Sequence, residues 1–207
     1  MTDIFHITHI RNLPGILQNG GLWCDRVVSQ RNLAHISIAH QHIKDRRAQK
    51  QVPLPPNGMV ADYVPFYFAP RSPMLYSIAH GFVEGYQGGQ TCILHLVASA
   101  ESVLQSGLAF VFTDGHAEMD ISHFYRDLHN LNKIDWNIMQ SRYWNDTNED
   151  GDRKRRRQAE FLVHEFVPLS LVERIGTINQ TTARQTATLL ADFQPKPTVQ
   201  VHPAWYY

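Results

Sequence analysis

The sequence predicts an α+β fold with a mixed, split β-sheet and flanking helices. Short apolar runs typical of strands alternate with short helical segments along the whole chain, and no segment repeats. The 207 residues suit one domain, 1–207, that is long enough to bury a substantial core.

Apolar runs and alternating patterns predict the strands of the sheet. The predicted strands are 4–10, 22–24, 64–69, 91–98, 109–113, 159–166 and 198–202. The run at 91–98 is apolar over most of its length, which predicts a buried strand. Asp114-Gly115 predicts a turn directly after the strand at 109–113.

Capping residues and helix breakers predict the flanking helices. The predicted helices are 12–20, 38–50, 73–83, 122–131, 135–144 and 181–193. Pro14 falls in a first turn and Gly20 just past an end, positions that both residues favour. Ser122 and Asp135 are N-cap types. The segment 53–58 contains three prolines and is expected to be a loop.

The overall charge excludes a strong field for nucleic acid or a membrane surface. Nineteen basic residues balance nineteen acidic ones, so any anion binding must come from local clustering. Cys24 and Cys92 are too few for a disulfide framework. The first residues lack the pattern of a signal peptide, and no run approaches the roughly 20 apolar residues that span a bilayer. We therefore expect a cytoplasmic protein without membrane contact.

Glu160 is the most informative single residue. A polar loop from about Trp144 to Arg157 ends in five consecutive basic residues, 153–157, and Glu160 follows in the apolar run 159–163. A lone charge in an apolar strand needs a partner, because unpaired burial is costly. An adjacent arginine could be that partner in a structural ion pair, or Glu160 could be a catalytic acid that meets an anionic substrate.

The spacing of histidines, cysteines and glycines argues against a metal site or a common phosphate-binding loop. His6 and His9 would face opposite sides of a strand, and His40 and His42 would lie about 200° apart on a helix. There is no H-E-x-x-H motif and no cysteine pair at ligand spacing. The glycine-rich segment 85–90 fits neither G-x-G-x-x-G nor the Walker A motif, so a flexible turn is expected there.

The helix around Arg47 carries a cluster of positive charge. His40, Lys44 and Arg47 recur at i, i+4 and i+7 and so share one face, while Arg46 and Lys50 lie on an adjacent face. Only Asp45 offsets them. The cluster is either a solvated helix face or a site for a pyrophosphate or a nucleic-acid backbone.

Aromatic and basic residues interleave between Tyr63 and Met74. Single-strand binding proteins combine stacking surfaces with cations in this way. The alternative is a buried strand whose aromatic side chains fill the core. Alternation permits Phe66 and Phe68 to point inward with Tyr67 outward, or the reverse.

Taken in order, these segments resemble the DarT family, the DNA ADP-ribosyltransferase toxins of the DarT–DarG toxin–antitoxin systems. The resemblance covers nearly the whole chain. It rests on His6-Ile7-Thr8-His9-Ile10, Leu13-x-Gly15-Ile16-Leu17, Arg46-Arg47, Asp62-Tyr63-Val64-Pro65-Phe66-Tyr67-Phe68, Pro70-Arg71-Ser72-Pro73-Met74-Leu75-Tyr76, Gly88-Gly89-Gln90, Phe110-Val111-Phe112-Thr113-Asp114, Gln158-Ala159-Glu160 and Trp205-Tyr206-Tyr207. It implies a diphtheria-toxin/PARP-like ADP-ribosyltransferase fold.

The resemblance also implies roles for individual residues. Glu160 would be the transferase glutamate and Arg47 the key arginine of an NAD-binding element at 31–49, with an ADP-ribosylating turn-turn loop at 116–160. The other residues expected to bind NAD are His6, Ile7, Thr8, Gly15 and Trp23. The residues expected in DNA-contacting regions are Tyr67, Arg71, Met74, His116, Tyr143, Trp144, Arg153 and Lys154.

The implied activity is mono-ADP-ribosylation of thymidine N3 in single-stranded DNA, with NAD as co-substrate, no metal, and a DarG-like macrodomain antitoxin as partner. The alternatives are transfer to guanine, RNA or protein, NAD hydrolysis alone, and a non-catalytic single-strand-binding module. The resemblance makes Arg47 the acceptor of the N3 proton. Arginine is always protonated and has no acceptor lone pair, so we expect Arg47 to stabilise the N3 anion or a flanking carbonyl instead.

Overall fold

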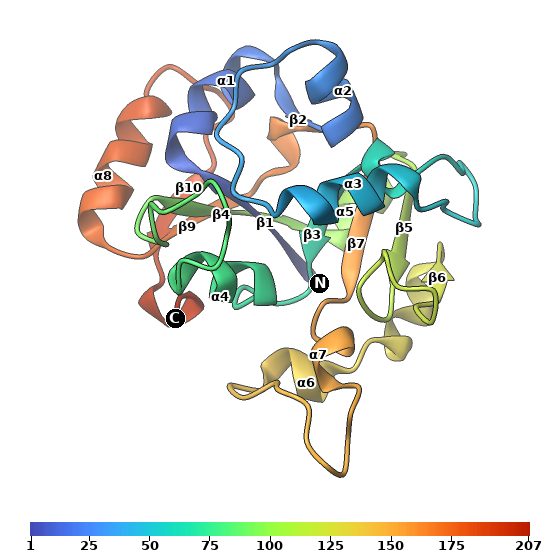
Figure 1. Cartoon of the computed structure of the whole chain (residues 1–207). Coiled ribbons are helices and arrows are strands. Elements are labelled where there is room, and N and C mark those ends of the chain that lie inside the picture. Colours follow the sequence, from blue (N-terminus) through green and yellow to red (C-terminus); the bar gives the residue numbers. More distant parts are fainter.

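The computed structural model describes residues 1–207 and is built on a mixed eight-stranded sheet with strand order β10-β9-β4-β1-β3-β7-β5-β6 (Figure 1). The strands are β1 (Asp3–His9), β3 (Tyr63–Tyr67), β4 (Ile93–Ser99), β5 (Phe110–Thr113), β6 (Phe124–Tyr125), β7 (Glu160–His164), β9 (Arg174–Thr177) and β10 (Thr198–Val201). Only β9 and β10 pair in parallel. A second small sheet joins β2 (Gly21–Trp23) to β8 (Phe166–Pro168). The mixed sheet predicted from the sequence is confirmed.

The large sheet is weakly joined between β1 and β3. β1 pairs with β4 along its whole length, but its pairing with β3 is limited to Phe5 opposite Tyr67. A side chain crosses this junction, because the ring of His6 donates from Nδ1 to the carbonyl oxygen of Pro65 at 2.8 Å. The sheet is therefore split into two halves at its centre.

Short helices cover the sheet. They are α1 (Leu13–Gln18), α2 (Asp25–Gln30), α3 (Gln41–Gln49), α4 (Pro73–Ala79), α5 (Ala100–Gln105), α6 (Trp136–Gln140), α7 (Arg153–Arg156) and α8 (Gln180–Leu189). Short 3-10 helices lie at Ile10–Asn12, Val60–Asp62, Leu128–Lys133, Leu169–Leu171 and Pro203–Trp205. α3 crosses in front of the sheet, and α6 and α7 project below it in Figure 1. No helix is both long and apolar enough to cross a membrane.

Helix starts follow local capping chemistry. Ser72 accepts from the backbone N–H of Leu75 at the start of α4, and Pro73 occupies the first turn, where its missing N–H is not needed. Asp135 caps α6 in the same way, as its residue type predicted. His40 has an extended conformation, so the helix predicted from 38 begins only at Gln41.

Several sequence-based assignments were wrong or missing. The helix expected at 122–131 is instead β6 followed by a 3-10 turn, because Phe124 and Tyr125 pair with the edge of β5. The strand expected at 159–166 breaks at Glu165, whose φ of 58° is left-handed, and the chain turns there into β8. α2, α5 and β9 were not predicted. Part of the loop expected at 144–157 is helical, as α7.

The core fixes which side chains face the functional surface. Phe66 and Phe68 are buried in the larger hydrophobic cluster, with Leu94, Phe112 and Phe161. Tyr67 points to the other face, where it packs against the smaller cluster under α4. The alternation in β3 is thus resolved with Phe66 and Phe68 inward.

Gly176 tests the packing at the C-terminal end. A Cβ at this position would lie 2.3 Å from Cζ3 of Trp205, whose ring packs edge-to-face on Phe5 at 5.3 Å. We expect Gly176→Ala to displace Trp205 and lower the free energy of unfolding by about 1–3 kcal/mol, the usual cost of overpacking. Urea denaturation measures this. Gly151→Ala is the control, since nothing lies within 4 Å of its Cβ position; equal stability of the two variants would contradict the packing argument.

Candidate active site

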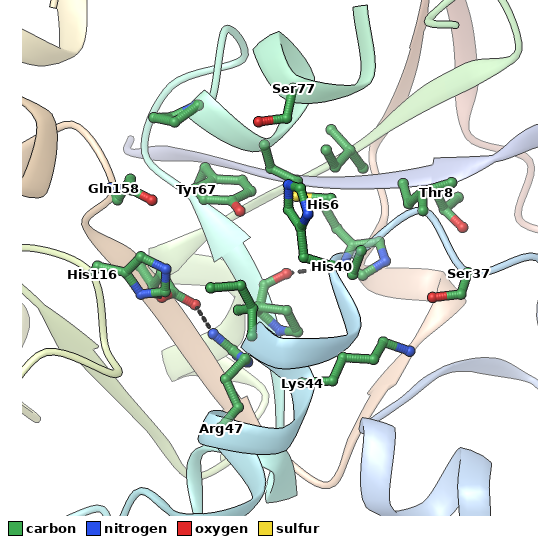
Figure 2. A pocket seen from close by; sticks show the side chains of 18 of the residues that line it. His6, Thr8, Ser37, His40, Lys44, Arg47, Tyr67, Ser77, His116 and Gln158 are labelled. Carbon is green, nitrogen blue, oxygen red and sulfur yellow. Dashed lines mark hydrogen bonds and ion pairs between the residues drawn. The ribbon is translucent and has the colours of Figure 1, made fainter. Parts of the chain in front are cut away.

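A cleft of about 580 Å³ lies over the split in the sheet. It is lined by His6, Ile7 and Thr8 of β1, Pro65 and Tyr67 of β3, and Glu160 of β7, together with residues of α3 and α4. Figure 2 shows His6, Tyr67 and Arg47 around it. Because the strands are barely paired here, side chains from both halves of the sheet meet in one cavity. This is the structural reason for the position of the cleft.

Glu160 and Arg47 form a buried ion pair in this cleft. Oε2 of Glu160 accepts from Nη1 of Arg47 at 2.6 Å, a contact that joins β7 to α3 (Figure 2). Oε1 accepts from the backbone N–H of Ala117 at 3.0 Å and lies 3.5 Å from Nδ1 of His116. Glu160 is 2% exposed and Arg47 is 7% exposed. The partner of Glu160 is therefore a distant arginine, and the structural pair with an adjacent arginine is excluded.

Both members of the pair are held in their charged forms. Burial alone would raise the pKa of Glu160, but the Arg47 charge, His116 and the hydrogen bonds from Arg47 and Ala117 outweigh burial and lower the pKa. Burial alone would lower the pKa of Arg47, and Glu160 overcomes this and raises it. Nη2 of Arg47 is buried and has no hydrogen-bond partner. The guanidinium thus keeps unused donor capacity at the cleft.

Ion pairs, rather than apolar packing, hold α3 over the cleft. Arg47 is the only buried residue of this helix. Nε of Arg46 lies 2.6 Å from Oε2 of Glu118, and Nζ of Lys50 lies 2.5 Å from Oδ1 of Asp120. His40, Lys44 and Arg47 all line the cleft, although His40 is extended and lies just before the helix. Arg46 and Lys50 instead fasten the helix to the segment after β5.

The residues expected to bind NAD mostly meet in the cleft. His6, Ile7, Thr8 and Trp23 line it, whereas Gly15 does not. Burial lowers the pKa of His6, and its Nδ1 is occupied by the Pro65 carbonyl, so its Nε2 is left as an acceptor. Trp23 lies against the ring of Phe166 at 4.3 Å, with the guanidinium of Arg31 over its ring at 4.2 Å. Their roles in NAD binding stay predictions.

The residues expected to contact DNA divide into two groups. Tyr67, Met74, His116, Trp144 and Lys154 line the cleft, and Arg71, Tyr143 and Arg153 do not. Trp144 is buried, and its Nε1 donates to the hydroxyl of Tyr207 at 3.0 Å. The guanidinium of Arg71 lies 4.3 Å from the centroid of the same tyrosine ring. Whether these residues contact DNA also stays a prediction.

The basic run 153–157 is mostly engaged within the protein and does not form an open cationic surface. Acids already neutralise Arg155 and Arg156, and the buried guanidinium of Arg157 donates only to backbone carbonyl oxygens. The partners are Asp114 and Asp152 for Arg155, Asp135 and Asp150 for Arg156, and the carbonyls of Arg71, Ile138 and Met139 for Arg157. Arg153 donates to the carbonyls of Tyr143 and Asn145. Lys154 is the member of the run that is exposed and faces the cleft.

Asn12 is a site-building residue that the sequence did not reveal. Its Nδ2 donates to Oγ1 of Thr8 at 3.1 Å and to the carbonyl of Ile36, and its Oδ1 accepts from the N–H of Ile36 at 2.7 Å. Asn12 thereby fastens the segment before α3 to β1. A lone asparagine in a turn gives no signal of such a role. No group of three or more metal-ligating side chains occurs in the structure.

Comparison with known proteins assigns the family. The family described as "ssDNA thymidine ADP-ribosyltransferase, DarT" matches residues 5–207. The DNA ADP-ribosyl transferase of Thermus sp. (strain 2.9) is 46% identical over 208 residues, covering 100% of this chain and 96% of the relative. A DNA ADP-ribosyl transferase–DNA ADP-ribosyl glycohydrolase fusion protein of Thermosipho africanus is 29% identical over 80% of this chain and 39% of its own length.

Solved structures agree with this assignment. The Thermus sp. 2.9 DarT in complex with ADP-ribosylated ssDNA superposes with a TM-score of 0.92 at 44% identity, over 100% of this chain and 96% of that chain. The same protein in complex with NAD+ gives a TM-score of 0.89 at 43% identity, over 100% and 98% of the two chains. The fold, the cleft on the split sheet and these matches lead to one conclusion: the chain belongs to the DarT family of ADP-ribosyltransferases.

Proposed function

We propose that this protein transfers one ADP-ribose from NAD to the N3 atom of a thymidine in single-stranded DNA and releases nicotinamide. The observation that carries the proposal is the buried Glu160 that lines the cleft, held ionised by Arg47 at 2.6 Å. Membership of the DarT family and the two complexes of the Thermus relative, with NAD+ and with ADP-ribosylated ssDNA, support the choice of substrates.

Glu160 suits the cleavage of a glycosidic bond to nicotinamide. As the bond breaks, positive charge develops at C1″ of the ribose, and a carboxylate bonded to the 2″-hydroxyl stabilises that charge. The carboxylate of Glu160 is already ionised and oriented by Arg47 and Ala117, so little reorganisation accompanies the reaction. Its burial strengthens the electrostatic effect, because few water molecules screen it.

Arg47 suits the stabilisation of the attacking base. Thymine N3 must lose a proton before or during attack, and a guanidinium whose pKa is raised cannot accept that proton. The unpartnered Nη2 of Arg47 can donate to a thymine carbonyl and stabilise the N3 anion. Glu160 or a water molecule then carries the proton away. N3 is blocked in a Watson–Crick pair, which accounts for a single-stranded substrate.

We further propose that the protein is a toxin that acts in the cytoplasm and that its partner is a macrodomain antitoxin of the DarG type. The support for this proposal is the Thermosipho relative, whose name joins a DNA ADP-ribosyl transferase to a DNA ADP-ribosyl glycohydrolase in one chain. A hydrolase that removes ADP-ribose from DNA is the activity that would reverse the proposed reaction.

The central test uses two oligonucleotides that differ only by the presence of thymine. We expect an added ADP-ribose, detected by mass, on the thymine-containing strand alone. Glu160→Gln should lower this activity roughly 10²–10³-fold, because it removes a charge that acts in the transition state. Glu165→Gln, an exposed acid just after β7, is the control and should keep full activity.

Three results would contradict the assignment: no adduct on either strand, an adduct on the thymine-free strand, or an adduct that survives Glu160→Gln. Thermal unfolding of the variant must accompany the assay, because Gln leaves Arg47 buried without a counter-charge.

Arg47→Lys tests planar recognition by the guanidinium. Lysine keeps the positive charge beside Glu160 but loses the fork and the free Nη2 donors. We expect kcat/KM for the oligonucleotide to fall about 10–100-fold, the loss of a hydrogen bond from a charged donor. Hydrolysis of NAD in the absence of DNA should fall less. Near-wild-type transfer by the lysine variant at neutral pH would show that a simple charge suffices.

The Glu160–Arg47 pair should also determine how stability depends on pH. The pKa of Glu160 is depressed, so its contribution is complete above the unfolded value of about 4.3 and is lost as the pH falls through the folded pKa. In Arg47→Met, burial dominates and raises the pKa of Glu160. The contribution of Glu160 to the free energy of unfolding should then decrease as the pH rises above about 4.3. Between about pH 4.5 and pH 7, Glu160 should add no slope to the urea midpoint of the wild type, whereas the midpoint of Arg47→Met should fall relative to it as the pH rises. Parallel slopes would mean that Arg47 does not control Glu160.

A further inference from the structure

We infer that an exposed aromatic stack at the end of α4 binds a second nucleobase of the DNA strand, one that neighbours the target base; this inference rests on the proposed function. The stack consists of Tyr76, His80 and Phe82. Tyr76 and Phe82 line the same cleft as Glu160 and Arg47.

The three rings of the stack pack against one another in a compact group, with Tyr76 and Phe82 6.3 Å apart and inclined by 57°. The rings of Tyr76 and His80 are 4.0 Å apart and inclined by 32°, and those of His80 and Phe82 are 5.6 Å apart and inclined by 25°. His80 is oriented by a hydrogen bond of 2.9 Å from its Nδ1 to the carbonyl of Tyr76. The Phe82 ring of this group is largely exposed, and an exposed aromatic ring is the kind of surface on which unpaired bases stack.

The backbone fixes the outer ring in place. Gly81 has a φ of 69°, and the N–H groups of Gly81 and Phe82 donate to the carbonyls of Ile78 and Ser77. This is a Schellman ending of a helix, which turns the chain back over the last helical turn. Phe82 is held beside His80 without freezing a flexible loop at the moment of binding.

The inner end of the stack is anchored in the core. The ring of Tyr76 meets Trp144 edge-to-face at 5.6 Å and Tyr207 at 5.1 Å. The stack therefore continues from buried aromatic residues beside the cleft to its rim. A strand whose target base enters the cleft would pass this rim with its next bases unpaired.

Packing alone accounts for only part of this arrangement. A Schellman ending commonly includes an apolar contact with the helix, and the contact of Phe82 with Tyr76 at 6.3 Å meets that need. Phe82 nevertheless remains 61% exposed, far more than such a contact requires. Lys154, exposed on the same cleft, supplies a cation for the connecting phosphate. An exposed aromatic ring and an exposed cation on one cleft are the combination that single-strand binding uses.

The experiment combines Phe82→Ala with abasic sites placed one at a time beside the single thymine of an oligonucleotide. In the wild-type protein, one flanking abasic position should lower both affinity and kcat/KM for the strand by roughly tenfold, the usual effect of losing one stacked base. Phe82→Ala should lower both by a similar factor on the intact strand, and the abasic site at that position should then have no further effect. Affinity is measured by fluorescence anisotropy without NAD.

Matched variants isolate the ring. Phe82→Trp should restore binding, since it keeps a π-face. Leu104→Ala removes an apolar side chain that is 54% exposed and lies outside the cleft, and it should change nothing. The KM for NAD should be the same in all variants.

The inference is overturned if the Phe82→Ala and abasic effects are additive at every position, if strand affinity is unchanged, or if the KM for NAD rises instead. The last result would assign the stack to the adenine of NAD. Failure of the proposed function has a different signature: no adduct from the wild-type protein. The anisotropy data still decide the inference in that case.

Discussion

The buried pair of Arg47 and Glu160 is the interaction on which the rest of the site depends. It joins residues 113 positions apart, on α3 and β7, at 2.6 Å. Removing two charges from water costs much free energy. Their mutual attraction offsets this cost only with good geometry and further hydrogen bonds. The further bond to Glu160 comes from Ala117, and the pairs Arg46–Glu118 and Lys50–Asp120 hold α3 and the segment after β5 together around it.

The pair also divides the chemistry between its two members. Glu160 is fixed in its ionised form by one hydrogen bond to each carboxylate oxygen and keeps lone pairs for a ribose hydroxyl, which suits a residue that stabilises developing positive charge. Arg47 uses one nitrogen for Glu160 and leaves Nη2 free. Arg47 is always protonated, its pKa is raised further, and it has hydrogen-bond donors to spare. It is therefore suited to bind an anion and not to remove a proton.

The sequence predicted the interior better than the site. Apolar runs located β1, β3, β4, β5 and β7, because burial leaves a direct mark on composition. β6 was taken for a helix, since its pairing with β5 is a tertiary contact of two residues that no local pattern encodes. The residues alone left an adjacent arginine as the candidate partner of Glu160. The resemblance to DarT placed Arg47 in the same active site but did not pair it with Glu160. In the run 153–157, charge in the sequence is not charge at the surface. Four acids pair with Arg155 and Arg156, and five backbone carbonyls accept from Arg153 and Arg157.

The split in the sheet explains why these residues can meet at all. In a continuously paired sheet the backbone groups of β1 and β3 would satisfy each other, and the side chains above them would pack as core. Here Phe5 and Tyr67 form the single paired position of β1 and β3. Pro65 has no backbone N–H to donate, and the ring of His6 donates to the carbonyl oxygen of Pro65. The missing backbone hydrogen bonds between β1 and β3 lower stability, but the gap between the two halves of the sheet leaves room for a cavity. Tyr67 and Glu160, opposite each other in β3 and β7, are thereby presented to the cleft at the edge of one half, while His6 to Thr8 face it from the other.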